Sequence, residues 1–316
     1  MQITLAALVV FVLSATPAAA GAVGFQRVTV PDSGDKPREV GIWYPSDAPA
    51  FPQPLGSHRQ TVAPDGGLAG NRLPLIVVLH GVQGSFENHY DTALALAEAG
   101  FVVAAVAQSQ EIHLVERPRH VARVLDYMLA AWAYHARVDP TRIGIIGWSH
   151  GGMITLLSVF RNPSTFRSAV AMVPVTNLFQ RLAWKGVERQ HQAIDPANRY
   201  GGLPAERHDV YKERSPLYNI DKLQIPLHVG VTRNDDDVNI EEDMQLVDAL
   251  RSRKPALAET MVYDSPPGGH TFDRRVDPKT WQPENTREQR DSWNRVWTFL
   301  DWNLDPFHAE LHTSTK

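Results

Sequence analysis

Hydrophobic residues along this chain follow two alternating patterns. Continuous apolar runs such as Leu75–Leu79 and Val102–Val106 predict strands that are buried on both faces. Further strands are expected at 143–146, 169–173, 226–231 and 260–263. The stretches between them repeat their apolar residues every three or four positions, which predicts helices at 90–99, 115–135, 153–160, 240–250 and 284–304. Strands that alternate with helices in this way predict an α/β fold with a mostly parallel, doubly wound sheet flanked by helices.

Two regions depart from the alternation. Residues 26–30 and 39–44 predict an N-terminal antiparallel hairpin at the sheet edge, and the Pro- and Gly-rich residues 45–73 predict a long surface connection. The segment at about 174–218 is too long for a plain connection, so we expect an insertion over the strand ends. Residues 21–316 are thus predicted to form a single domain with one insertion.

The first twenty residues have the features of a secretory signal peptide. An apolar stretch at 3–13 is too short to span a membrane, and Ala18-Ala19-Ala20 offers small residues for cleavage before Gly21. We therefore expect a secreted or periplasmic protein with no stable membrane span after processing. This leader contains no Lys or Arg, which leaves open an alternative in which it is retained as an anchor.

Composition excludes several chemistries. The 31 Lys and Arg residues against 35 Asp and Glu, spread without runs, argue against a nucleic-acid partner. The chain has no cysteine, which excludes disulfides, a thiolate nucleophile and cysteine-ligated metals. His113, His120 and His150 lack the spacing of zinc ligands. We expect no metal and no cofactor, so that a nucleophile must be an oxygen or an amine; the sequence does not predict the oligomeric state.

The segment Gly147-Trp148-Ser149-His150-Gly151-Gly152 carries the strongest chemical signal. It follows a predicted buried strand and precedes a predicted helix, the context of a G-x-S-x-G nucleophile elbow. Glycines at the flanking positions would let strand and helix pass close together, with the Ser149 hydroxyl expected to point into the open. A serine that only caps a helix is the structural alternative.

A serine hydroxyl needs a base, and the base needs an orienting acid. In this fold the acid and then the histidine follow the serine in sequence. Asp235 comes after the strand predicted at 226–231, and His270 after the strand predicted at 260–263, so both lie at carboxyl ends of parallel strands. Asp236 is the alternative acid, since three aspartates are adjacent.

These motifs together resemble the α/β-hydrolase superfamily, and within it the dienelactone-hydrolase-like and prolyl-oligopeptidase-like serine hydrolases. The resemblance extends from about Leu73 to His270. Its elements are Leu79-His80-Gly81, Asp139-Pro140-Thr141-Arg142-Ile143-Gly144, the elbow, Ser215-Pro216-Leu217, Asp235-x-x-Val238 and Gly269-His270. The chain departs from the pattern in two ways: true dienelactone hydrolases use a cysteine, and the propeller of prolyl oligopeptidases has no room before Leu73.

The resemblance implies a role for each of these residues. Ser149 would attack the acyl carbon, His270 would carry the proton, and Asp235 would hold the imidazole; the family's spacing to Val238 favours Asp235 over Asp236. The backbone N–H groups of His150 and Val82 would form the oxyanion hole. As a separate inference, Trp148 is a candidate for substrate binding, together with Phe179, Trp184 and Tyr200 of the insertion.

We therefore expect an exported serine hydrolase that cleaves small carboxylic esters through an acyl-enzyme. Its activity should rise with pH as His270 loses its proton, over the ordinary histidine range of roughly pH 6–7. A peptidase or amidase acting on short peptides is the alternative, because both reactions pass through the same tetrahedral oxyanion. A second alternative is a non-catalytic binding protein on the same fold. The sequence does not specify the acyl and alcohol groups.

Overall fold

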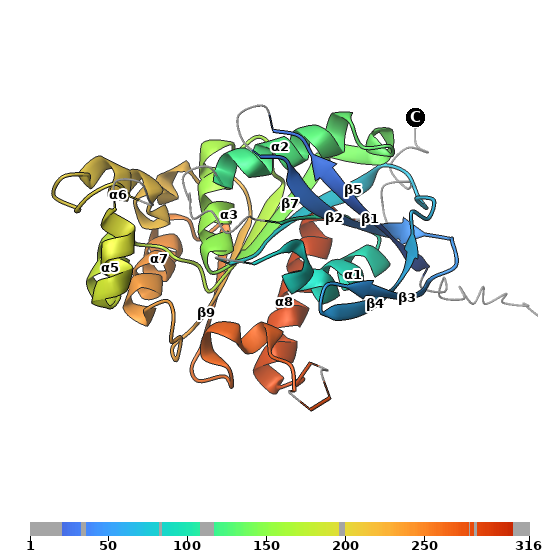
Figure 1. The fold of residues 1–316 in the computed structure, drawn as a ribbon. Coiled ribbons are helices and arrows are strands. Elements are labelled where there is room, and N and C mark those ends of the chain that lie inside the picture. The colour runs from blue at the N-terminus through green and yellow to red at the C-terminus, as the bar shows by residue number, and fades with distance from the viewer. Residues whose placement is uncertain are drawn as a thin grey trace, which may run out of the picture.

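The computed structural model describes residues 21–32, 36–81, 84–107, 117–195, 200–277, 279–280 and 283–305. In this part of the chain a ten-stranded sheet has the order β10-β9-β8-β7-β5-β6-β2-β1-β4-β3, with helices on both faces (Figure 1). The predicted leader, residues 1–20, lies outside the described residues. Across the ranges above, no helix combines the length and apolar character needed to span a membrane.

Six neighbouring strands form the parallel part of the sheet, and their crossovers are helical, which confirms the predicted fold class. The strands are β5 (Leu73–Leu79), β6 (Val102–Val106), β7 (Val138–Trp148), β8 (Ser168–Met172), β9 (Leu227–Thr232) and β10 (Ala258–Tyr263). The helices that flank them are α1 (Tyr90–Glu98), α2 (Arg117–Ala130), α3 (His150–Arg161), α7 (Ile240–Arg253) and α8 (Arg287–Leu304).

Alternate side chains of β5 enter two separate hydrophobic cores. Leu75 and Val77 belong to a core that also contains side chains of α2, α3 and α7. Ile76 and Val78 point to the opposite face, where α1 and α8 complete the second core. All four side chains are buried, which explains why the strand is apolar throughout and not at alternate positions only.

The antiparallel region is larger than predicted. Strands β1 (Ala22–Val30) and β2 (Arg38–Ser46) form the expected hairpin, and β2 joins the parallel part through β6. Beyond β1 lie β4 (His58–Pro64) and then β3 (Phe51–Leu55), so the prediction of a plain surface connection over 45–73 is wrong. The prolines of β3 are compatible with this because an outermost strand does not need every N–H for the ladder.

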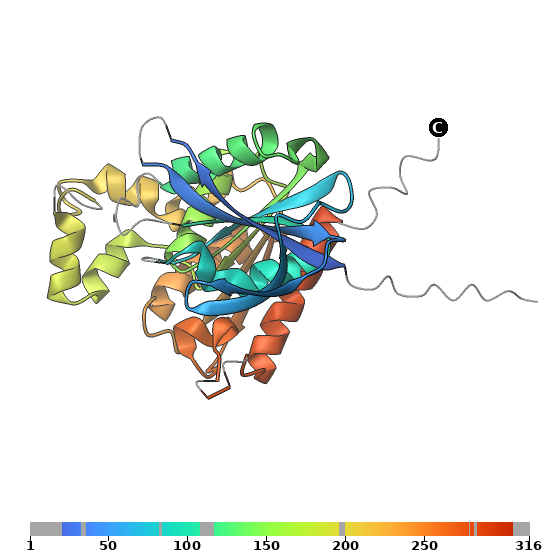
Figure 2. The ribbon, with the colours of Figure 1, turned by 45° about the vertical axis from the view of Figure 1, so that its right-hand side comes forward.

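The segment between β8 and β9 contains three short helices and a 3₁₀ turn. These are α4 (Leu178–Trp184), α5 (Val187–Ile194), α6 (His208–Arg214) and η3 (Pro216–Lys222). Figures 1 and 2 show α5 and α6 projecting at the end of the molecule opposite β3 and β4. The other 3₁₀ turns are η1 (Phe86–His89), η2 (His135–Arg137) and η4 (Gly269–Arg274).

Candidate active site

Ser149 occupies a sharp turn between β7 and α3. Its backbone has φ 57° and ψ −122°, a conformation that costs a residue with a side chain about 1–3 kcal/mol. The Ser149 N–H donates to the carbonyl oxygen of Met172 in β8 at 3.0 Å, and the Ser149 carbonyl accepts from the Met153 N–H in α3 at 3.1 Å. The neighbouring strand and helix thus hold the serine in its strained conformation, as a nucleophile elbow requires.

The elbow glycines are required by close backbone contacts. A Cβ on Gly147 would lie 2.3 Å from the carbonyl oxygen of Gly151. A Cβ on Gly151 would lie 2.3 Å from the carbonyl oxygen of Leu79, at the end of β5. Any side chain at either position would therefore push β5, β7 and α3 apart.

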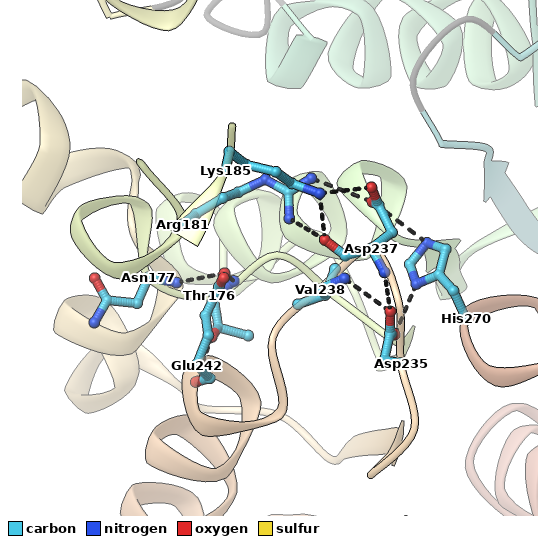
Figure 3. Close-up of polar contacts among 9 residues, drawn as sticks. All are labelled: Thr176, Asn177, Arg181, Lys185, Asp235, Asp237, Val238, Glu242 and His270. Carbon is cyan, nitrogen blue, oxygen red and sulfur yellow. Dashed lines mark hydrogen bonds and ion pairs between the residues drawn. The ribbon is translucent and has the colours of Figure 1, made fainter. Parts of the chain in front are cut away.

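Asp235 and His270 form a hydrogen-bonded pair at the same edge of the sheet. Asp235 follows β9, and its buried Oδ1 accepts the N–H groups of Asp237 and Val238 at 2.8 and 2.7 Å. Its Oδ2 lies 2.7 Å from Nδ1 of His270 in η4 (Figure 3). The structure thus brings Asp235 to the imidazole, whereas the neighbouring Asp236 is exposed.

A buried hydrogen bond connects the elbow with the histidine loop. The indole Nε1 of Trp148 donates to Oδ2 of Asp273 at 2.5 Å, and Asp273 lies in η4 with His270. Among the described residues no hydrogen bond joins Ser149 to His270. Such catalytic pairs often lie apart without substrate and close when it binds.

Trp148 does not have the exposure that a substrate-binding side chain needs. It is fully buried, and its ring stacks on His89 at a centroid distance of 4.1 Å. We therefore correct the expectation for this residue: it supports the elbow from within the core. Of the other candidates, Phe179 and the buried Tyr200 both pack against Tyr211, and Trp184 is exposed between β8 and β9.

Asp237 has a role that the sequence did not reveal. Its carboxylate contacts Lys185 Nζ at 2.8 Å and the Arg181 guanidinium at 3.3 Å, and both cations come from the end of α4 (Figure 3). Its Oδ2 also lies 3.8 Å from Nε2 of His270. Burial raises the pKa of Asp237, but the Arg181 charge and the Lys185 hydrogen bond outweigh it and hold this pKa well below the ordinary range.

Of the two predicted oxyanion donors, the structure describes His150 but not Val82. His150 is the first residue of α3, where the helix dipole places partial positive charge. Val82 lies outside the described residues, but Gly81 is beside the serine, since a Cβ on it would lie 3.5 Å from Ser149 Cβ.

The histidines considered as metal ligands are dispersed. His120 is buried, with Nε2 3.0 Å from an Arg38 nitrogen, and His113 lies outside the described residues. Within the described ranges, no three His, Asp or Glu side chains are grouped as metal ligands would be.

An elbow serine and an acid–histidine pair, placed after strands β7, β9 and β10 of one doubly wound sheet, define a serine hydrolase with the α/β-hydrolase fold. The chain belongs to the prolyl oligopeptidase family, whose sequence model matches residues 88–305. This confirms the resemblance that the motifs indicated.

Similar proteins include both peptidases and a dienelactone hydrolase. Dipeptidyl aminopeptidase A of Saccharomyces cerevisiae is 30% identical over 136 residues, which cover 42% of this chain and 13% of that protein. The Pyrococcus horikoshii acylaminoacyl peptidase is 14% identical with a TM-score of 0.64, over 90% of this chain and 42% of that chain. A putative dienelactone hydrolase from Klebsiella pneumoniae is 18% identical with a TM-score of 0.55, over 89% of this chain and 99% of that chain.

The curated relatives are much longer than the matched region. The chain spans 13%, 18% and 27% of the first three of them, which are a dipeptidyl aminopeptidase and two acylamino-acid-releasing enzymes. Because these relatives are peptidases, the comparison favours the peptidase alternative over the expected ester substrate.

Proposed function

We propose that the protein is a serine peptidase or amidase that cleaves short peptides or acylated amines through an acyl-enzyme. The observation that carries the proposal is the bond between buried Asp235 and His270 Nδ1, at the sheet edge where the strained elbow presents Ser149. The amide specificity is supported by the relatives, which are peptidases.

In the proposed reaction His270 Nε2 accepts the proton of the Ser149 hydroxyl as its oxygen attacks the substrate carbonyl. Asp235 holds Nδ1–H, fixes the tautomer and stabilises the imidazolium. The N–H groups of His150 and Val82 would bind the oxyanion of the tetrahedral intermediate. His270 then returns the proton to the leaving amine, and water releases the acyl group by the same steps.

The same residues would also hydrolyse activated esters, because an ester passes through the same intermediate and has a better leaving group. The natural substrate is therefore identified by comparing aminoacyl and acylaminoacyl p-nitroanilides with p-nitrophenyl esters of matched acyl groups. Cleavage of the esters alone would replace the peptidase proposal with the small-ester alternative.

Replacing Ser149 by Ala tests the nucleophile. Turnover of both substrate classes should fall to the background rate, and a fluorophosphonate probe should label the wild type but not Ser149→Ala. Unchanged far-UV circular dichroism would show that the fold is intact. Turnover that survives in the folded variant contradicts the mechanism, and a wild type that neither turns over nor takes the probe would favour a binding protein.

We also propose that the protein is exported and that its leader is removed before Gly21. The support is the apolar leader, which ends in Ala18-Ala19-Ala20. N-terminal sequencing of the protein from culture medium and cell fractions should yield Gly21 as the first residue; Met1 retained in a membrane fraction would indicate an anchor.

A further inference from the structure

Asp237 places a second carboxylate beside the proposed base. Its Oδ2 lies 3.8 Å from Nε2 of His270, whereas Asp235 holds Nδ1 on the other side of the ring. Nε2 is the nitrogen that must face Ser149. A carboxylate that moved into hydrogen-bond range would accept a hydrogen bond from protonated Nε2 and so stabilise the imidazolium, which is unable to act as a base.

Two cations from the insertion hold this carboxylate in place. Lys185 Nζ donates to Oδ1 at 2.8 Å and to the Asp237 carbonyl oxygen at 2.6 Å. The Arg181 guanidinium donates to Oδ2 at 3.3 Å and to the same carbonyl oxygen at 3.2 Å. Backbone and side chain of Asp237 are thus both fixed, and Figure 3 shows the two cations on the side of Asp237 away from Asp235.

Arg181 and Lys185, the two residues of this clamp on Asp237, are held by a helix that is anchored to the core. Oε1 of buried Glu242 in α7 accepts the N–H groups of Thr176 at 2.7 Å and Asn177 at 3.0 Å, immediately before α4. The Asn177 side chain caps α4 by accepting the N–H of Phe179 at 3.1 Å. Because α4 is fixed at its start, Arg181 and Lys185 approach Asp237 from a defined direction.

The charges around His270 show why the clamp matters. Asp235 and Asp237 face the imidazole from the loop after β9, and Asp273 and Arg274 share its own turn, η4. Arg181 and Lys185 are the cations that contact Asp237, and their side chains are only 6% and 15% exposed. Burial lowers the pKa of Lys185, and its hydrogen bond to Asp237 opposes that shift. In this position a charge is poorly screened, so it acts on the groups around it more strongly than a charge at the surface would.

We propose that Arg181 and Lys185 are positioning residues, which restrain Asp237 and offset its charge so that His270 Nε2 stays available to Ser149. They act through Asp237 and need not touch the substrate. The inference rests on the proposed function. It assigns to the segment between β8 and β9 a part in the chemistry, because cations from α4 act on the protonation of His270 through Asp237.

Substituting Lys185 by Met tests this directly through the pH profile of kcat/KM. With the cation removed, Asp237 favours the imidazolium, so the midpoint of the acid limb should move to higher pH by at least about half a pH unit. Lys212→Met is the matched control, since Lys212 is an exposed lysine on α6 of the same segment and its loss should leave the midpoint unchanged.

Asp237→Asn should have the opposite effect, because removal of the anion disfavours the imidazolium and moves the midpoint to lower pH. The double variant Lys185→Met/Asp237→Asn should return the midpoint toward the wild-type value. A role of Lys185 in folding alone predicts lower activity at every pH, an unmoved midpoint and no rescue by Asp237→Asn; this result would overturn the proposal.

An NMR titration of the His270 ring in Ser149→Ala, with and without Lys185→Met, gives a readout that does not depend on turnover. The ring should titrate at higher pH when Lys185 is absent, and an unchanged titration would refute the clamp. If the wild type shows a clear acid limb and Lys185→Met leaves its midpoint unchanged, this inference alone is overturned. Activity that survives in Ser149→Ala would instead overturn the proposed function.

Discussion

Hydrogen bonds within its own loop orient the Asp235 side chain, in addition to its contact with the histidine. Two backbone N–H groups, from Asp237 and Val238, bind Oδ1 and leave Oδ2 directed at Nδ1 of His270. Asp236 lies between Asp235 and Asp237 in sequence and is exposed. The spacing of acid, two residues and valine therefore reflects a turn that closes on the carboxylate.

This geometry predicts very different effects for two adjacent substitutions. Asp235→Asn keeps the shape but favours the wrong tautomer of His270, so kcat should fall by about 10³–10⁴. Asp236→Asn should change kcat by less than about threefold, because its side chain is exposed and does not contact the imidazole. Steady-state kinetics on one substrate compare the two, and equal losses would contradict the assignment of Asp235.

Sequence motifs could predict residues whose role depends on local structure. Ser149, Asp235 and His270 each follow a strand of the parallel sheet, so their placement requires only the strand order of the fold. Asp237 and Trp148 were beyond such reasoning. Their partners Lys185 and Asp273 are 52 and 125 positions away, and only the packing of the insertion and of η4 brings them together.

At the scale of elements, one buried carboxylate ties the start of β7 to its surroundings. Asp139 Oδ1 accepts the N–H and hydroxyl of Thr141 at 3.0 and 2.7 Å. Its Oδ2 meets Arg72 before β5 at 3.1 Å and Arg142 at 3.2 Å. Arg142 also donates to the carbonyl oxygen of Leu304, so that this group joins β5, β7 and the end of α8.

Asp139→Asn should therefore destabilise the fold in a pH-dependent way. Burial raises the pKa of Asp139, but the hydrogen bonds from Thr141, Arg72 and Arg142 prevail and lower it from 3.8 to about 2. Because the folded-state pKa is lowered, the ionised Asp139 stabilises the fold above the unfolded-state pKa, and this contribution is lost as the pH falls toward about 2. The free energy of unfolding of the variant at pH 7 should therefore be about 2 kcal/mol lower than that of wild type.

Urea unfolding at a series of pH values measures this loss. The difference from wild type should shrink below about pH 4, as the unfolded-state carboxylate becomes protonated. Asp301→Asn, at an exposed position on α8, should be neutral throughout. A loss at Asp139 that does not change with pH would show that packing, and not the charge, is responsible.

Elements with a strong hydrophobic period were predictable, and those with mixed signals were not. Strands β5 and β6 are apolar throughout because both cores contact them, and β6 matches its expected bounds. Strands β3 and β4 lie at the sheet margin, where Pro52 and Pro54 and many exposed positions resemble a loop. Their pairing is a tertiary effect that no local pattern contains.

Across the whole molecule, buried and partly buried acids change the free energy of unfolding in opposite directions as the pH changes. Asp139 and Asp237 have lowered pKa values and favour folding above the unfolded-state range. Burial raises the pKa of Asp273, and burial with the charges of Glu242 and Asp235 raises that of Asp243. For these two the sign is reversed: their contribution is most favourable below the unfolded-state pKa, and it is lost as the pH rises through the folded-state value.

A substitution of Asp243 can measure the destabilising contribution of a buried acid whose pKa is raised. Asp243 is fully buried in α7, and neither carboxylate oxygen has a hydrogen-bond partner among the described residues. Asp243→Asn removes the cost of keeping this acid out of water, so the free energy of unfolding at pH 7 should increase by about 1–3 kcal/mol. The gain should vanish below about pH 4, where the unfolded chain no longer profits from ionisation, and Asp248→Asn on the exposed face of α7 should show neither effect. Should Asp243→Asn instead weaken the fold at pH 7, the expectation that burial of this carboxylate is costly would be wrong.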